Sequence, residues 1–213
     1  IKPFKCGYNQ AERRVFMKRI YAMLILITLI SGVYVYAEET KGEIADAVLR
    51  LHVVANSDSE ADQALKIKVR DAVRKEFSYF AQNAEYKTDA VMLAKENSGR
   101  IAEAAIAVIK EEGFDYPVKV EIGKADFPTK SYSGITLPKG RYDAVNVKIG
   151  KAKGKNWWCF MYPPLCIADS VSAEFMPEAK AELKAAISDS LYKIISEPES
   201  DGVKIKFKIL EIF

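Results

Sequence analysis

The order of hydrophobic and polar positions along the chain predicts a strand that leads directly into a helix. Residues 48–55 are largely β-branched and apolar, which is typical of a strand. After the polar junction 56–59, apolar residues recur at helical spacing as far as residue 80. Ser57 and Glu60 have the spacing of a capping box, so we expect the helix to begin there. Charged residues recur along another face of this helix: Asp62, Lys66, Arg70 and Arg74.

The same patterns predict the remaining elements. Residues 88–112 have helical spacing with an interruption at 97–99, and residues 178–195 have it again. Alternating apolar and polar positions predict strands over 117–122 and 203–209, and two further strands are expected over 142–149 and 156–162. The turn 150–155 is rich in glycine and lysine, and we expect it to join its flanking strands as a hairpin. Residues 124–140 carry Gly, Pro, Ser and Thr and predict an exposed excursion with room for a short hairpin.

These elements predict an α+β fold. Strands bracket helices without a strict β-α-β order, so we expect a mixed sheet of about five strands packed by about three helices. Neither an internal repeat nor a long linker divides the sequence. After the N-terminal segment, the chain therefore reads as one compact domain.

The N-terminal segment has the composition of a secretory signal peptide. Lys18-Arg19 precedes an unbroken apolar run over residues 20–30, and small side chains at Val35 and Ala37 precede Glu38. This order predicts cleavage between Ala37 and Glu38. The alternative is an uncleaved anchor, because the 18 residues 20–37 are barely enough to span a bilayer.

This reading divides the chain into two parts. We expect residues 1–37 to consist of upstream residues and the signal peptide, and the true start to be Met17. Residues 38–213 are then the exported domain. The net charge of +3 comes from the first part, which holds six of the 32 basic residues and one of the 29 acidic residues. The remainder is slightly acidic, so the charge gives no argument for nucleic-acid binding.

Two cysteines follow the predicted leader, Cys159 and Cys166. An even number of cysteines in an exported domain favours a disulfide, with two buried thiols as the alternative. A metal site is not expected, because His52 is the only histidine and the cysteine pair lacks a second pair of ligands. The sequence indicates no cofactor.

Candidate chemistry is sparse in this sequence. His52, Ser57 and Asp58 could form a hydrolase site, but neither a nucleophile elbow nor a glycine-rich oxyanion loop surrounds them. Trp157 and Trp158 are adjacent in a predicted strand, so their side chains should point to opposite faces of the sheet. One ring should enter the core, and the other should be covered by a helix or open to a partner.

Several blocks of the sequence, in the same order, resemble the stage II sporulation protein R family. The most specific block is Asn156-Trp157-Trp158-Cys159, which runs on to a Pro-Pro-Leu-Cys segment ending at Cys166. The other blocks lie at residues 50–58, 62–63, 66–71, 127–130, 135–140 and 149–150. The resemblance covers most of residues 48–167.

The resemblance implies a signal between compartments and not a reaction. Proteins of this kind are secreted from the forespore into the space between its membrane and that of the mother cell. There they activate a membrane-embedded aspartic protease, which processes the precursor of sporulation sigma factor E. The alternatives from the residues themselves are a cell-envelope hydrolase using His52 and a membrane-anchored binding domain.

On this basis we expect two segments, 56–63 and 157–166, to form or support the surface that meets the protease. A purely structural role for the same residues is the alternative. The candidate surface residues are Arg50, His52, Asn56, Ser57, Asp58, Asp62, Gln63, Trp157 and Trp158.

Overall fold

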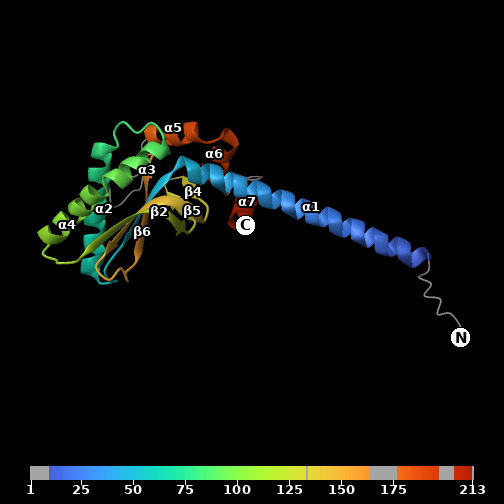
Figure 1. The fold of residues 1–213 in the computed structure, drawn as a ribbon, viewed down its shortest axis with the longest axis horizontal. Coiled ribbons are helices and arrows are strands. Elements are labelled where there is room, and N and C mark those ends of the chain that lie inside the picture. Colours follow the sequence, from blue (N-terminus) through green and yellow to red (C-terminus); the bar gives the residue numbers. More distant parts are fainter. Residues whose placement is uncertain (1–9, 133, 164–176, 197–203, 213) are drawn as a thin grey trace.

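A computed structural model describes residues 10–132, 134–163, 177–196 and 204–212 (Figure 1). A sheet with helices on both sides forms the domain, and a long N-terminal helix projects from it. The fold class is α+β, as predicted. The described residues form a four-stranded mixed sheet, a two-stranded sheet and seven helices.

The four-stranded sheet has the spatial order β2-β5-β1-β6. Its strands are β1 (Leu49–Val54), β2 (Val118–Phe127), β5 (Gly140–Ile149) and β6 (Asn156–Tyr162). Strand β1 is parallel to β5 and antiparallel to β6, and β2 is antiparallel to β5. The predicted hairpin over residues 150–155 is therefore wrong, because β1 lies between the two strands that this loop connects. The loop crosses the end of β1, where the Gly154 amide donates to the Ala55 carbonyl at 2.9 Å.

One face of this sheet is covered by α2 (Glu60–Phe80), α3 (Lys87–Glu96) and α4 (Ser98–Glu111). Leu51, Val69 and Val147 are fully buried between the sheet and these helices. The predicted interruption near Asn97 is confirmed as the boundary between α3 and α4. Gly113, at a φ of +80°, ends α4 in the left-handed conformation that glycine adopts without strain.

Helix α2 begins later than the predicted capping box implies. Its N-cap is Ser59, whose hydroxyl accepts the Asp62 amide at 3.2 Å. The loop before β6 holds the preceding residues outside the helix, because the Lys153 amide donates to the Asn56 carbonyl at 3.2 Å. Ser57 is consequently free to bond a side chain of the helix instead of capping it.

The opposite face of the sheet is covered in part by the remaining elements. They are the end of α1 (Gln10–Ala47), the hairpin β3 (Lys130–Tyr132) and β4 (Ile135–Leu137), and the helices α5 (Pro177–Ala186), α6 (Asp189–Ser196) and α7 (Lys204–Ile212). Residues 124–140 do contain a short hairpin, but the prediction that this segment is exposed is wrong, because Phe127, Ile135 and Leu137 are buried in the core. The single helix expected over 178–195 is instead two helices, α5 and α6, separated at Ile187 and Ser188.

The predicted C-terminal strand is a helix. Phe207 and Leu210 of α7 are 5% and 0% exposed, whereas Ile205 is 70% exposed. A strand would place Ile205 and Phe207 on the same face, but residues three apart share a face only in a helix. The alternation of isoleucine and lysine favours a strand locally, and packing of Phe207 and Leu210 in the core with α1 and α6 determines the helix instead.

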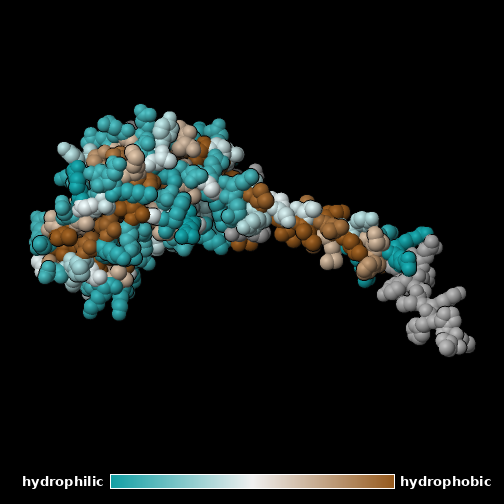
Figure 2. All heavy atoms as spheres, in the orientation of Figure 1, coloured by the Kyte–Doolittle hydropathy of each residue, from teal (hydrophilic) through white to brown (hydrophobic). Residues whose placement is uncertain are grey.

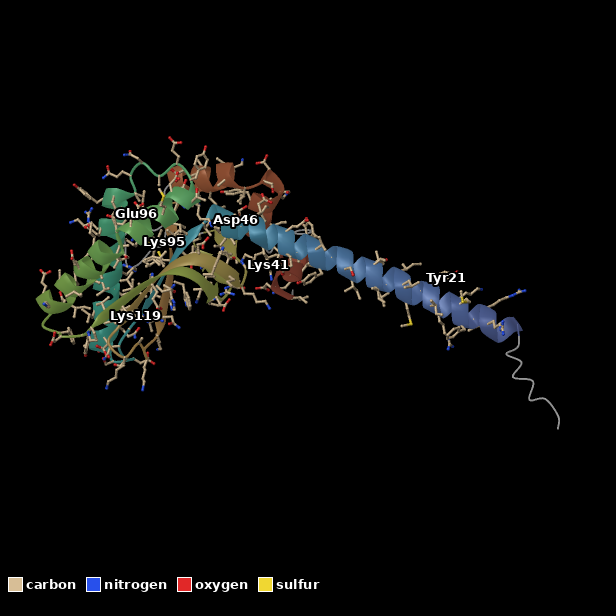
Figure 3. The ribbon with its side chains drawn as sticks, in the orientation of Figure 1. Tyr21, Lys41, Asp46, Lys95, Glu96 and Lys119 are labelled. Atoms are coloured by element: carbon tan, nitrogen blue, oxygen red, sulfur yellow. The ribbon has the colours of Figure 1, made fainter. Side chains whose placement is uncertain are left out.

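Helix α1 projects far beyond the domain. Its exposed length carries mostly apolar side chains, which Figure 2 shows as a brown rod with a hydrophilic far end. The helix is long and apolar enough to cross a membrane, a property that a signal sequence shares. In Figure 3, Tyr21 lies on the projecting part, and Lys41 and Asp46 lie where α1 meets the domain.

The last turns of α1 belong to the core of the domain. Ala37, Thr40, Ile44 and Ala47 form a buried stripe at helical spacing, and Ala37 and Ile44 are 0% exposed. The helix is continuous through the predicted cleavage point between Ala37 and Glu38. Cleavage at this point stays a prediction, as does the division of the chain into residues 1–37 and 38–213.

Candidate functional site

Polar side chains from all four strands meet on the sheet face opposite α2–α4. We call this group the open face and define it as His52, Glu121, Asn146, Lys148, Asn156 and Trp158. The pairing of the strands brings these residues together, because His52 lies opposite Asn146 on one side and Trp158 on the other. Asn156 is exposed, and the side chains of Glu121 and Lys148 are 41% and 42% exposed. A sheet of this kind commonly keeps one face in contact with water.

His52 occupies the centre of the open face. Its Nδ1 lies 3.1 Å from Oδ1 of Asn146, and its Nε2 lies 2.9 Å from Oδ1 of Asn156. The imidazole stacks on the Trp158 ring with a centroid distance of 3.9 Å and an interplanar angle of 9°. Phe127 packs against the edge of this stack, 4.7 Å from the Trp158 ring. His52 is therefore fixed in position by three strands and presents a rigid aromatic and amide surface.

Charged side chains border the open face along β2 and β5. Lys148 donates to Glu121 at 2.6 Å, and Lys119 lies 2.6 Å from the other carboxylate oxygen. Hydrogen bonds from Lys119 and then Lys148 lower the pKa of Glu121 to about 2. Glu121 is thus ionised at neutral pH, and this border can attract polar or charged groups of a partner.

Trp157 points to the opposite side of the sheet from Trp158, as predicted. It packs against the core beneath α2, and the Arg70 guanidinium lies 4.5 Å from its ring centroid. Its indole N–H is buried without a hydrogen-bond acceptor among the described residues. Trp157 therefore supports the fold, whereas Trp158 contributes to the candidate surface.

Arg50 is fully buried and does not belong to any surface. Its guanidinium lies 4.0 Å from the Phe127 ring and 4.8 Å from the Tyr142 ring, and it donates one hydrogen bond to Tyr132 at 2.8 Å. Its remaining Nε and Nη1 groups find no acceptor within the described part of the chain. Burial lowers the pKa of Arg50, although the nearby tyrosines oppose this effect. Cation–π contacts with these rings offset part of the desolvation cost.

The junction 56–63 is organised around a buried carboxylate. Asp62 is 4% exposed and accepts hydrogen bonds from Ser57 and from Asn56, the latter at 2.9 Å. Burial alone would raise the pKa of Asp62, but hydrogen bonds from Ser57, Asn56 and two further neighbours lower it. Gln63 donates to the Ser57 carbonyl at 2.8 Å. Most polar groups of the junction are therefore used within the fold.

The junction and the loop 150–155 are interlocked. The Asn56 side chain accepts the Lys151 amide at 3.0 Å, and the Asp58 carboxylate accepts the Lys155 amide at 2.6 Å. A Cβ on Gly154 would lie 2.1 Å from the Ser57 carbonyl oxygen, so only glycine fits there. Asp58 remains exposed while it accepts the Lys155 amide.

The hydrolase arrangement is not assembled. Both ring nitrogens of His52 face asparagine amides, the Ser57 hydroxyl donates to Asp62, and Asp58 accepts a backbone amide. His52, Ser57 and Asp58 therefore do not form a relay. Among the described residues, no group of three or more His, Cys, Asp and Glu side chains could hold a metal ion.

The structure describes only one of the two cysteines of the predicted disulfide. Cys159 lies in β6 and is 2% exposed. Cys166 lies outside the described residues, so the disulfide stays a prediction.

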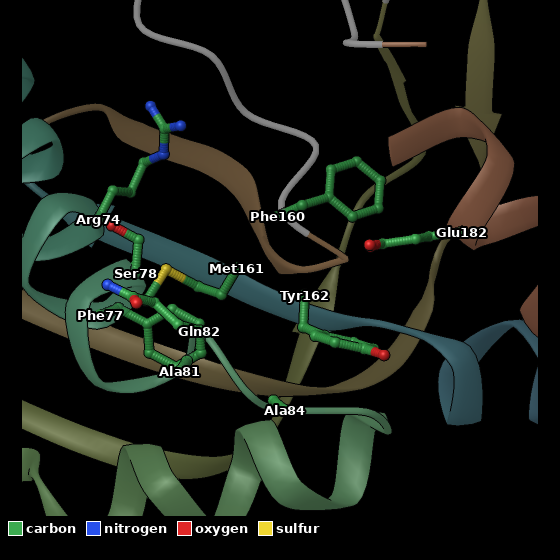
Figure 4. Close-up of a pocket in the computed structure, with 10 residues that line it drawn as sticks. All are labelled: Arg74, Phe77, Ser78, Ala81, Gln82, Ala84, Phe160, Met161, Tyr162 and Glu182. Atoms are coloured by element: carbon green, nitrogen blue, oxygen red, sulfur yellow. The ribbon is translucent and has the colours of Figure 1, made fainter. Parts of the chain in front are cut away.

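A cavity of about 320 Å³ lies between α2 and β6, separate from the open face (Figure 4). Its wall is mainly apolar, and in the close-up Phe77 of α2 lies next to Met161 of β6. Arg74 and Glu182 are the charged groups among its described lining residues. The Ser78 hydroxyl in this lining donates to the Lys75 carbonyl at 2.8 Å and not to a base, so we assign the cavity no chemistry.

Four of the open-face residues were not predicted as candidates: Glu121, Asn146, Lys148 and Asn156. The available signal was partial: Glu121 in 117–122 and Asn146 and Lys148 in 142–149 alternate with apolar residues, whereas Asn156 begins a strand without such alternation. That alternation does not reveal which strands are neighbours. Without the strand order, these positions could not be placed around His52.

Comparisons with known proteins agree with the resemblance seen in the sequence. Residues 45–172 match the family model described as stage II sporulation protein R. The chain is 31% identical over 209 residues to stage II sporulation protein R of Bacillus subtilis (strain 168), covering 90% of this chain and 93% of that protein. No solved structure matches the chain. The chain therefore belongs to the stage II sporulation protein R family, which supports a role in sporulation.

Proposed function

We propose that this chain is an exported signalling protein of endospore formation. It activates a membrane-embedded aspartic protease, and the protease processes the precursor of sporulation sigma factor E. Membership of the stage II sporulation protein R family carries this proposal. The site of action is the space between the forespore and mother-cell membranes.

The N-terminal helix supports export. Arg13, Arg14, Lys18 and Arg19 precede its apolar run, and an excess of basic residues is retained on the cytoplasmic side of a membrane. The domain at the other end of the helix would then lie outside the cytoplasm. Because Ala37 is buried within a continuous helix, a peptidase has to reach the bond after it before the domain folds.

The open face is the surface that we propose for the protease. It combines a rigid aromatic stack, two asparagine amides that can donate and accept hydrogen bonds, and the paired Lys148 and Glu121 at its border. Aromatic anchors with polar groups at the rim are typical of interfaces. Of the sequence-predicted surface residues, Arg50 and Asp62 are buried and Trp157 faces the α2 side of the sheet, so His52 and Trp158 are the ones that lie on the open face.

Reconstitution in a non-sporulating bacterium tests this function. The protease and the sigma-factor precursor are co-expressed with the full chain, without it, or with a chain lacking the apolar run 20–30. We expect the shorter, processed sigma factor only with the full, exported chain. Absence of processing, while the protease is detected in the membrane and the chain outside the cytoplasm, would contradict the proposal.

A further inference from the structure

Helix α7 has two different apolar stripes. Phe207 and Leu210 form the stripe that packs in the core. Ile205 and Ile212, seven residues apart and therefore on one face, are 70% and 69% exposed. Ile209, which is half-buried, lies between them on the helical surface. The outer stripe is unusual because a helix packed on a soluble domain normally presents polar residues outward.

Lysines accompany the outer stripe. Lys204 and Lys208 are both exposed, and the side chain of Lys208 is 58% exposed while it bonds Glu211 at 2.9 Å. At helical spacing, Lys208 stands beside the stripe formed by Ile205 and Ile212. An apolar stripe bordered by lysines is typical of a helix that lies in the interface of an anionic membrane.

The position of α7 in the fold is also consistent with contact to a membrane. Its core residues share a hydrophobic cluster with Ala37 and Ile44 of α1, which immediately follow the exposed apolar length of that helix. In Figure 1, α7 lies at the end of the domain from which α1 leaves. Tyr34 and Tyr36 mark the domain end of the apolar length and are 49% and 42% exposed, as expected where a helix leaves a bilayer.

We propose that α7 is a membrane-contacting helix, whose outer stripe seats the domain on an anionic lipid bilayer next to α1. The bilayer is the favoured occupant because α7 packs against the end of α1, directly beside the point where the exposed apolar length of α1 leaves the domain (Figure 1). The lysines supply the attraction to anionic headgroups. This inference applies to the chain that retains α1, the uncleaved alternative, and does not depend on which protein receives the signal.

Photocrosslinking of the full chain in vesicles tests the contact. Ile205 is replaced by benzoylphenylalanine, and the chain is reconstituted in vesicles of equal phosphatidylglycerol and phosphatidylcholine. Ile25 on α1, 60% exposed, serves as the position expected in the bilayer. Tyr79 on α2, 67% exposed, serves as the matched exposed position away from α7. Circular dichroism confirms that each variant is folded.

We expect lipid adducts by mass spectrometry at positions 25 and 205 and none at position 79. Lys204→Glu with Lys208→Glu should lower the yield at position 205 at least threefold and leave position 25 unchanged. Adducts at position 25 without adducts at 205 would overturn the proposal. A crosslinked product at position 205 with twice the mass of the chain would also overturn it, because a second copy would then be the occupant. Equal yields of lipid adducts at positions 205 and 79 would overturn it as well.

Discussion

Asp62 provides a test of the junction at the scale of one residue. The fold lowers the pKa of Asp62 from its ordinary value of 3.8. The ionised carboxylate therefore contributes its full stabilisation above about pH 3.8, the pKa in the unfolded chain. This contribution is lost as the pH falls through the lower pKa of the folded state. Asp62→Asn should cost about 1.5–3 kcal/mol at pH 7, because hydrogen bonds to a charged group are replaced by weaker ones. Urea unfolding at pH 7, 5 and 3 measures the difference, which should shrink only below about pH 4.

Asp126→Asn is the control for this experiment. Asp126 is an exposed carboxylate in β2, so its replacement should change the unfolding free energy by less than about 0.5 kcal/mol. A constant difference between wild type and Asp62→Asn at all three pH values would contradict the role assigned to the ionised carboxylate.

Gly154 tests the interlock between the junction and the loop 150–155. Gly154→Ala should destabilise the protein by about 1–3 kcal/mol, because the new Cβ meets the Ser57 carbonyl and two rigid segments have to separate. Gly99→Ala is the matched control, since nothing lies within 4 Å of its Cβ position in α4. The midpoint of thermal unfolding should fall only for Gly154→Ala, and equal midpoints for the two variants would contradict the interlock.

Arg50 shows why single residues of the site were difficult to predict. A charged side chain is rarely buried without a partner, so its assignment to the surface was reasonable. The rings that surround Arg50 come from β2, β3, β5 and β6, which are distant in sequence. Only the assembled sheet brings these aromatic residues around one guanidinium.

Helix α7 tests the fold at the scale of an element. Phe207→Ala should destabilise the protein by about 3 kcal/mol, whereas Ile205→Ala should change stability by less than about 0.5 kcal/mol. The reason is that only Phe207 is in the core, where it is 5% exposed. Chemical unfolding in detergent, without vesicles, measures both values. Similar losses for the two variants would favour the strand that the sequence pattern predicts.

Elements were predictable where local pattern and packing agree. The strand β1, the apolar stripe of α2 and the boundary between α3 and α4 follow from spacing alone. The charged residues that recur along one face of α2 are not all exposed to solvent. Lys66 and Arg70 are 4% and 5% exposed, because the Lys155 carbonyl and the Trp157 ring cover them.

At the scale of the whole molecule, the strand order determines the candidate site. Sequence predicted the α+β class and most strands but paired β5 with β6 as neighbours. Insertion of β1 between them places His52 between Asn146 and Trp158, and this creates the open face. Short-range turn signals cannot reveal such an insertion, because it depends on contacts between residues about a hundred positions apart.

The central claim is that the open face binds the protease. The most direct test is the affinity of the full chain for the protease held in lipid nanodiscs, measured for wild type, Asn156→Arg and Asn83→Arg. Asn156 is an exposed member of the open face, and Asn83 is an exposed residue between α2 and α3. We predict at least tenfold weaker binding for Asn156→Arg, about 1.4 kcal/mol, and no more than a twofold change for Asn83→Arg. Unchanged affinity for Asn156→Arg, or equal losses for both variants, would contradict the account.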